Sequence, residues 1–431
     1  MLLISKCTNE AFQLAVRMLF GKSPSFSHRV SHDLGPPFFN RGPSYDAVFF
    51  CAIGVGTDLK LAIAGTTHGD VTTYIPIGDT KTDDFVPLQM SLRDMVEVAH
   101  FLKRFDDTAV IEMYLSKDAW SLQVERTLTV LPQRLEIEVK AIPWRKIHTD
   151  IKADAGGEVS FPKVGLCFKK LFMRTFFAVG NVNKNVSALR VENGPDSAIR
   201  MVATDGNVLA IASRHALEPK KLGKLDEEKR AVHIHEAAVR AMWNILRAKT
   251  PTRARFILSG SQYVVEIDDC QIHSAAYTGV FPDYTELAEK YSKQAMKSLF
   301  TVTNTPDFTS FMKALHGSAE MAIEVTEKKL YVATRINTLG VVYDLGHSAV
   351  FDIVWKGTPR RHKAFFRVSC LRDTWLSLGM DAWFGFGGGV LDAGCLYARD
   401  NCTVAMVMPM RDEVEEMEKR IAAMKAREED T

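Results

Sequence analysis

One type of segment recurs three times in this sequence, at intervals far longer than those of a simple repeat protein. In each copy apolar residues and a threonine lead into a polar turn, and more apolar residues follow, which is typical of two strands joined by a tight connection. The copies lie at residues 55–64, 202–212 and 332–342. Their threonines, Thr57, Thr204 and Thr334, are 147 and 130 residues apart. This period predicts whole domains in tandem, because solenoid repeats are only about 20–50 residues long.

Two sets of amphipathic helices recur with similar spacing. Apolar residues at helical intervals predict one set at residues 91–102, 236–246 and 369–378. Another helix is predicted near the start of each unit, at residues 10–19, 162–178 and 305–315, and Pro306 suits the first turn of the last one. Strand-like runs follow the helices. We therefore predict three tandem copies of one α+β domain.

Length and composition agree with this organisation. The chain has 431 residues, which suggests two to four domains at roughly 100–200 residues each. Polar stretches at residues 144–158 and 288–297 are interpreted as linkers. The predicted domains are residues 1–150 with an insertion at 23–44, residues 158–290 and residues 297–411. Residues 412–431 form a tail with eight acidic and four basic side chains.

Charge and cysteine content exclude several classes of protein. The net charge is only +2, so binding to a polyanion requires a local basic patch. The sequence has neither an apolar run of about 18 residues nor the pattern of a signal peptide, so we expect a cytoplasmic protein without a membrane partner. Seven scattered cysteines and the absence of a Cys-x-x-Cys pair argue against disulfides and a structural zinc site.

Enzyme motifs are weak. Gly54-x-Gly56 lacks the third glycine of a dinucleotide-binding loop, and residues 385–389 are interpreted as a hairpin turn because no Lys-Ser/Thr follows these glycines. His233 and His235 share one strand face, but no third metal ligand is evident. We therefore predict no enzymatic activity, cofactor or metal.

Four short motifs, in order along the repeat, resemble one family. Residues 204–210 read Thr-Asp-Gly-Asn-Val-Leu-Ala, residues 281–284 read Phe-Pro-Asp-Tyr and residues 407–411 read Val-Met-Pro-Met-Arg. They resemble motifs of the bacterial sliding clamp, the beta subunit of the replicative DNA polymerase. Residues 56–59 in the first unit are also similar to the clamp pattern.

The resemblance implies a head-to-tail dimer that closes into a ring of six domains, with helices inside and sheets outside. Such a ring encircles duplex DNA without sequence preference and tethers the replicative polymerase. Basic side chains on the predicted helices are candidates for phosphate contacts in the channel, or else lie on solvated outer faces. These candidates are Arg17, Lys169, Lys170, Arg174, Arg240, Arg247, Lys313 and Arg372. The strand predicted at residues 121–131 is the candidate edge for ring closure.

The resemblance also implies a hydrophobic pocket for short linear motifs of the polymerase and the clamp loader. Its predicted wall is Thr204, Gly206, Asn207, Val208, Leu209, Pro282, Val407, Met408, Pro409, Met410 and Arg411, with Val186 and Leu287 added by spacing. The alternative is that the C-terminal stretch is an ordinary core strand. Asn207-Val208 replaces the family's His-Arg pair, so peptide preference is expected to differ.

The function predicted from the sequence is therefore that of a DNA sliding clamp, a non-enzymatic processivity factor. A divergent phage or mobile-element copy with altered partners is the alternative, and an enzyme on the same scaffold is a third. In the tail, Val414, Met417, Ile421 and Met424 form an apolar stripe. The tail either lies on its own domain or frays in solvent, or else it covers the adjacent pocket and competes with partner peptides.

Overall fold

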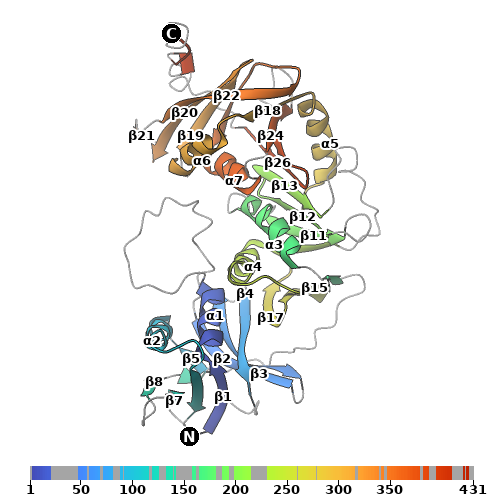
Figure 1. Cartoon of the computed structure of the whole chain (residues 1–431). Coiled ribbons are helices and arrows are strands. Elements are labelled where there is room, and N and C mark those ends of the chain that lie inside the picture. Colours follow the sequence, from blue (N-terminus) through green and yellow to red (C-terminus); the bar gives the residue numbers. More distant parts are fainter. Residues whose placement is uncertain are drawn as a thin grey trace. The chain divides into compact units, whose positions relative to one another are not determined.

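The computed structural model describes two compact units (Figure 1). Unit 1 comprises residues 1–30, 41–169 and 237–277, and unit 2 comprises residues 31–40, 170–236 and 278–431. The residues whose structure is described are 2–20, 47–55, 58–67, 71–80, 88–90, 92–115, 119–125, 133–138, 140–141, 158–161, 165–180, 187–193, 199–214, 231–259, 261–277, 279–315, 319–338, 341–343, 347–378, 382–387, 395–409, 421–422 and 424–426. The predicted insertion at 23–44 lies outside them. Among these residues no helix is long and apolar enough to cross a membrane.

Unit 1 contains two antiparallel sheets. Strands β1, β6, β7 and β8 form one sheet in that order, and the other runs β10-β15-β16-β17-β4-β3-β2-β5-β9. The strands are β1 (Leu2–Thr8), β2 (Ala47–Val55), β3 (Asp58–Thr67), β4 (Val71–Asp79), β5 (Leu88–Met90), β6 (Val110–Leu115), β7 (Ala119–Glu125), β8 (Gln133–Glu138), β9 (Lys140–Ala141), β10 (Glu158–Phe161), β15 (Ala254–Ser259), β16 (Gln262–Ile267) and β17 (Cys270–Ala275). The helices are α1 (Asn9–Phe20), α2 (Leu92–Leu102) and α4 (Glu236–Ala248), and the chain passes from unit 1 to unit 2 within α3 (Gly165–Met173).

Unit 2 is built on one antiparallel sheet. Its strand order is β14-β11-β12-β13-β26-β25-β24-β18-β22-β20-β19-β23, with β21 paired to β20. The strands are β11 (Ala188–Asn193), β12 (Ile199–Thr204), β13 (Val208–Ser213), β14 (Ala231–His235), β18 (Ser298–Val302), β19 (Ala319–Val325), β20 (Lys329–Thr338), β21 (Val341–Tyr343), β22 (Ser348–Gly357), β23 (His362–Arg367), β24 (Trp383–Gly387), β25 (Cys395–Arg399) and β26 (Thr403–Val407). The helices are α5 (Tyr284–Ala295), α6 (Thr305–Ala314) and α7 (Val368–Leu378), with a short 3-10 turn at Phe176–Ala178.

The order of elements repeats along the chain. Each of α1, α3 and α6 is followed by at least three strands before the next helix, and so is each of α2, α4 and α7; the short β21, which pairs with β20, is left out when the third strand after α6 is counted. The third strand after α1, β4, pairs with the third strand after α4, β17. The third strand after α3, β13, pairs with the third strand after α7, β26. We call these two strand pairings, β4 with β17 and β13 with β26, the sheet junctions. Both use the same two positions of the repeated pattern.

The helices have clear local causes. In α6 the Asn304 side chain accepts a hydrogen bond from the Asp307 amide, and Pro306 occupies the first turn. In unit 1, the Asn244 Nδ2 of α4 donates a 2.8 Å hydrogen bond to the Leu19 carbonyl near the end of α1. That bond satisfies one of the carbonyls that the end of a helix leaves unpaired.

Four predictions about local structure differ from the structure. Residues 288–297 are mostly part of α5, whose buried side chains are Tyr284, Ala288, Ser292 and Ala295. In the third copy, the residues after Thr334, where a polar turn was predicted, continue strand β20. The predicted helix at 162–178 is shorter, since α3 ends at Met173. The predicted edge strand at 121–131 corresponds to β7, which pairs with β6 on one side and β8 on the other.

Helix α5 packs on two glycines of β24. A Cβ at Gly385 would lie 2.8 Å from the Ala295 carbonyl oxygen, and one at Gly387 would lie 2.7 Å from that of Tyr291. These separations are shorter than a carbon–oxygen contact permits, so only glycine admits the helix backbone at this distance. The glycine-rich stretch predicted as a turn therefore begins as a strand that receives a helix.

Candidate functional site

The turn between β12 and β13 is held by its own side chains. The Asp205 carboxylate accepts hydrogen bonds from the amides of Asn207 (2.9 Å) and Val208 (3.0 Å). Thr204 Oγ1 accepts from the Gly206 amide at 3.1 Å, and Gly206 has φ +89°, which favours glycine. Burial raises the pKa of Asp205, although the backbone amides oppose this shift. The turn thus presents a fixed backbone beside the end of β13.

The C-terminal strand β26 continues the sheet next to this turn. Val208 is paired with Val407, and one residue further the Met408 amide donates a 2.8 Å hydrogen bond to the Asn207 carbonyl. Val208 and Val407 are buried, whereas Met408 is 39% exposed. The Asn207 Nδ2 is buried and has no hydrogen-bond partner within the described part of the chain. The end of the ladder therefore offers an accessible thioether beside an unused amide donor.

The Phe-Pro-Asp-Tyr motif begins helix α5. Asp283 caps the helix by accepting from the Thr285 amide at 3.0 Å. Tyr284 is 1% exposed and packs in one cluster with Leu209 and Met406. Its hydroxyl donates a 2.7 Å hydrogen bond to Glu192. The motif therefore lies on the sheet face formed in part by β13 and β26.

The structure brings many of the predicted pocket residues together. The turn and the end of β26 are adjacent, and Tyr284 connects the helical motif to Leu209 in the same cluster. Thr204, Val208, Leu209 and Val407 are buried, Asn207, Pro282 and Pro409 are half-buried, and Gly206, Leu287 and Met408 are exposed. Val186, Met410 and Arg411 lie outside the described residues.

A polar group beneath α5 was not predicted from the sequence. Glu192 is fully buried and accepts from Tyr284 and, at 2.7 Å, from the Arg190 Nε. Arg200, also buried, lies 3.6 Å from the same carboxylate. The Arg190 guanidinium lies 6.0 Å from the centre of the Phe281 ring. Alternating charges on neighbouring strands were the available signal, but their pairing requires knowledge of the register between β11 and β12.

The predicted channel residues fall into different environments. Arg17 on α1 and Arg247 on α4 are exposed, and Arg240 on α4 is half-buried. On other helices Lys170 and Lys313 are exposed and Lys169 is half-buried. These side chains remain candidates for phosphate contacts.

Arg372 was wrongly assigned to the channel surface. It is 1% exposed, donates a 2.8 Å hydrogen bond to the Leu315 carbonyl and lies 3.4 Å from the Asp373 carboxylate. Its position on an amphipathic helix did not reveal that it points into the core. Arg174 also has a partner, since its guanidinium lies 2.8 Å from the Asp400 carboxylate.

The histidine pair does not assemble a metal site among the residues described. His233 lies against the Phe281 ring, with 5.1 Å between ring centres. Burial and the nearby Arg190 lower the pKa of His233 to about 4. No group of three or more potential ligands occurs in the described chain.

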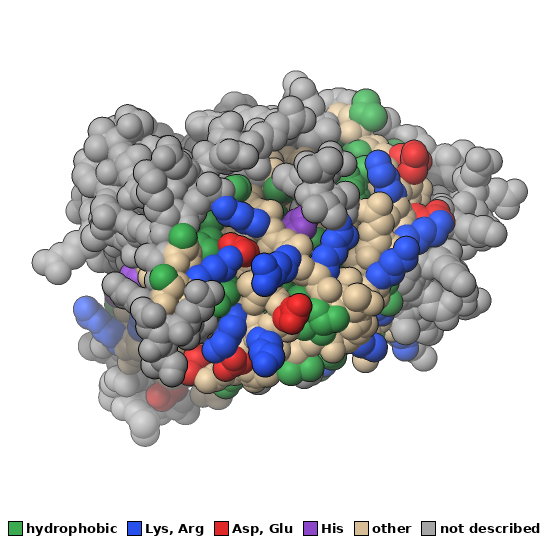
Figure 2. All heavy atoms as spheres, turned by 90° about the horizontal axis from the view of Figure 1, so that it is seen from above, with side chains coloured by type: hydrophobic (Ala, Val, Ile, Leu, Met, Phe, Trp, Pro, Cys, Tyr) green, Lys and Arg blue, Asp and Glu red, His purple; other side chains and the backbone are tan. Residues whose placement is uncertain are grey.

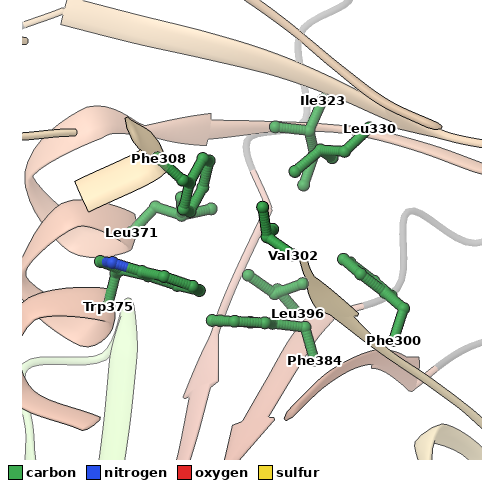
Figure 3. A pocket seen from close by; sticks show the side chains of 9 residues that line it. All are labelled: Phe300, Val302, Phe308, Ile323, Leu330, Leu371, Trp375, Phe384 and Leu396. Carbon is green, nitrogen blue, oxygen red and sulfur yellow. The ribbon is translucent and has the colours of Figure 1, made fainter. Parts of the chain in front are cut away.

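A small apolar cavity lies in the core between β-strands and helices α6 and α7 (Figure 3). It measures about 20 Å³, and its lining side chains include Phe308, Trp375 and Phe384. The side chains that line it are all apolar, so a water molecule would find no hydrogen-bond partner there. It is a packing defect in the core.

The described part of the tail packs on a sheet. Ile421 is 1% exposed in a cluster with Tyr331 and Phe365, and Met424 packs against the same cluster. Lys425 forms an ion pair with Glu324. This placement agrees with the alternative in which the tail lies on its own domain.

Neither a scan against protein-family models nor a search of curated protein sequences finds a match. Structural similarity is extensive. A structure of the DNA polymerase sliding clamp of Pseudomonas aeruginosa with a ligand has a TM-score of 0.61 and 14% identity, covering 95% of this chain and 100% of that one. This chain has the sliding-clamp fold.

Two further clamp structures agree. The DNA polymerase III beta subunit of Thermotoga maritima has a TM-score of 0.62 and 14% identity, covering 95% of this chain and 100% of that one. The beta subunit of Borrelia burgdorferi, in complex with a natural product, has a TM-score of 0.66 and 13% identity, covering 96% of this chain and 99% of that one. The fold expected from the short motifs is thus confirmed.

Proposed function

We propose that this chain is a DNA sliding clamp, a non-enzymatic ring that surrounds duplex DNA and tethers a polymerase to it. The ring consists of two copies, each contributing three domains in tandem. A tethered polymerase stays at high local concentration near the primer end. The fold supports this proposal, and the pattern of sheet junctions carries it.

The two junctions within the chain support ring closure. Each joins the third strand after the first helix of one repeat to the third strand after the second helix of the next repeat. Applied once more, this rule joins β22 of one copy to β8 of another. Within the described residues, β8 pairs only with β7, and residues 348–351 of β22 pair only with β20. The next residue, Asp352, accepts from the Thr303 amide on the other edge. Two copies joined in this way leave neither of these edges open.

Solvent exposure agrees with an unoccupied edge. Every residue of β13 and of β26 is buried. In the corresponding part of β22, Ser348 and Asp352 are exposed and Ala349, Val350 and Phe351 are half-buried. A strand in the same position of the repeat but without its neighbour is expected to differ in this way.

The peptide site is proposed at the end of β26. Met408 and Leu287, both 39% exposed, supply apolar contacts to the peptide. Methionine adapts to differently shaped apolar anchors. Val208, where the family carries a charged side chain, is buried, so recognition here depends less on charge.

The ring is tested by native mass over a dilution series, followed by retention on DNA. We expect a species of twice 48.2 kDa that persists on dilution. After loading by a clamp loader, it should remain on a closed circle in high salt and be released when the circle is cut. A monomer at all concentrations, or equal retention on linear DNA, would contradict the proposal.

The peptide site is tested by Met408→Ala with Met296→Ala as a matched control. Both methionines are accessible, at 39% and 37% exposure, but only Met408 belongs to the proposed site. We expect Met408→Ala to weaken binding of a clamp-binding peptide about 10-fold, as loss of an apolar anchor implies. The control and the native mass should not change. Equal affinities for both variants would place the site elsewhere, and strong preference for one dedicated polymerase's peptide would favour the divergent-copy alternative.

A further inference from the structure

A basic surface surrounds the connection between β22 and β23. The sequence from Asp352 to Asp373 contains six lysines and arginines and no acidic residue between these two aspartates. Figure 2 looks onto the side of the molecule where β22 and β20 lie, and lysine and arginine side chains gather there. The residues that define the basic surface are Lys297, Lys356, Arg360, Arg361 and Lys363.

The backbone holds these side chains near one another. Gly357 pairs with Ser298, and the Thr358 amide donates a 3.1 Å hydrogen bond to the Lys297 carbonyl. A Cβ at Gly357 would lie 2.4 Å from that carbonyl, and its φ is +102°, so the turn requires glycine. On the other side of the turn, the His362 ring stacks on Phe386 with 3.9 Å between ring centres. The connection is therefore anchored on both strands.

Four of the five cations of the basic surface form no ion pair with the described carboxylates. Lys297, Lys356 and Arg361 are exposed, and no carboxylate of the described residues forms an ion pair with them or with Arg360. Nearby carboxylates have partners of their own. Asp352 pairs with Lys329 at 3.1 Å, and Glu324 pairs with Lys425.

Lys363 and Lys356 lie on the sheet face opposite α6 and α7. Lys363 lies on the same strand face as Phe365. Phe365 belongs to the cluster that contains Ile421. Lys356 lies over the Trp383 ring at 5.6 Å, and Trp383 packs on the cluster covered by α5. By contrast, Phe384, the neighbour of Trp383, faces the cavity beside α6 and α7. The basic surface is thus separate from the helical face proposed for the channel.

We propose that this basic surface is an accessory binding site for the phosphate backbone of DNA outside the ring. Lys297, Lys356, Arg360 and Arg361 form no ion pair with the described carboxylates. Such a cluster of cations fits a polyanion of regularly spaced charges and carries no base-specific readout. The identity of the polyanion rests on the proposed clamp function. The basic surface contacts DNA electrostatically, for example a segment on its way into the ring.

Closed circular DNA without a clamp loader separates the two sites. A closed ring cannot be threaded by a closed circle, so binding at low salt reports the outer surface. The test variant is Arg360→Ala with Arg361→Ala, and the matched control is Arg17→Ala with Arg247→Ala, which removes the same charge from α1 and α4. Each lost phosphate contact costs about 10-fold in affinity near 50 mM salt, so the test variant should bind on the order of 100-fold more weakly. Its salt slope should fall by about 2.

The outcomes differ clearly. Loss of binding in the test variant and not in the control supports the proposal, provided that the native mass of both is unchanged. Equal binding by the test variant and the wild type overturns it. If the wild type binds polyglutamate as tightly as the circle, and the test variant loses both, the site is a docking surface for acidic proteins and the proposal fails. Failure of the clamp function itself would appear as a monomeric native mass, with the contrast between the two variants still measurable.

Discussion

A proline at Ser348 tests the strand pairing proposed for ring closure. In β22, the Ile353 amide donates to the Lys328 carbonyl at 3.0 Å, so Ile353 faces β20. Backbone groups alternate in direction along an antiparallel strand, so Ser348, Val350 and Asp352 face the other side. The Asp352 carbonyl agrees, since it accepts from Thr303 at 3.0 Å beside β18. Ser348 therefore presents its N–H to the open edge.

Ser348→Pro removes this N–H and leaves the pairing with β20 intact, because proline is tolerated at strand edges whose N–H faces solvent. One hydrogen bond is lost at each interface, and a dimeric ring has two interfaces. At about 1 kcal/mol per bond, the dimer loses roughly 2 kcal/mol. We expect the dimer dissociation constant to rise about 30-fold.

Sedimentation velocity over a dilution series measures this change, and Ser348→Ala is the control because it keeps the N–H. Thermal unfolding at low concentration checks that the monomer fold is preserved. The reasoning is refuted if Ser348→Pro dimerises as tightly as the wild type, or if Ser348→Ala weakens the dimer equally.

Three further changes test particular contacts. Tyr284→Phe removes a donor from the fully buried Glu192 carboxylate, and should lower the free energy of unfolding in urea by about 1.5–3 kcal/mol; an unchanged midpoint would contradict this. Burial lowers the pKa of His362 from 6.5 to about 4. As the pH falls, the unfolded chain therefore takes up this proton before the folded chain does. The contribution of neutral His362 to stability is complete above about pH 6.5 and is lost as the pH falls towards 4. His362→Phe, which preserves stacking on Phe386, should make the pH dependence of urea unfolding shallower. Ile421→Asp should detach the tail and lower the melting temperature, since burial of this side chain contributes about 2 kcal/mol, while peptide affinity stays constant; tighter peptide binding would instead mean that the tail competes for the site.

The elements with strong local signals were predicted from the sequence. The apolar period at residues 91–102 and 369–378 corresponds to α2 and α7 within one residue at each end. The strand–turn–strand at 202–212 corresponds to β12 and β13, because Asp205 and Gly206 determine the turn through local hydrogen bonds and a positive φ. Such features depend on neighbours in sequence, so the sequence carries their signal directly.

Helix α5 shows why other elements were missed. Its buried positions include Ala288, Ser292 and Ala295, which have little hydrophobic signal, and its lysines lie on the solvated side. The helix is stabilised by close approach to Gly385 and Gly387, about 100 residues further along the chain. Composition alone does not reveal this contact. The polar residues of the exposed face were therefore interpreted as a linker at 288–297.

The candidate site was also predicted only in part, because some of its features depend on neighbours in sequence and others on distant contacts. The turn at 204–208 and the strand ending at Val407 were each predictable, and short motifs connected them. The burial of Arg372 was not predictable, since its hydrogen bond to Leu315 joins two helices and an amphipathic pattern alone does not distinguish a buried arginine from an exposed one. The open edge likewise follows only from the full list of strand pairs.

The proposed peptide site and the sheet junction have one structural origin. The ladder between β13 and β26 ends at Val208 and Val407, where Gly206 turns the backbone away. The last backbone bond, from the Met408 amide to the Asn207 carbonyl, fixes Met408 just beyond the ladder, so its side chain is exposed while its backbone is held. An apolar anchor on a rigid backbone loses little conformational entropy when a peptide binds. A peptide at this position would therefore contact both strands of the junction, which predicts that binding stabilises the junction against opening.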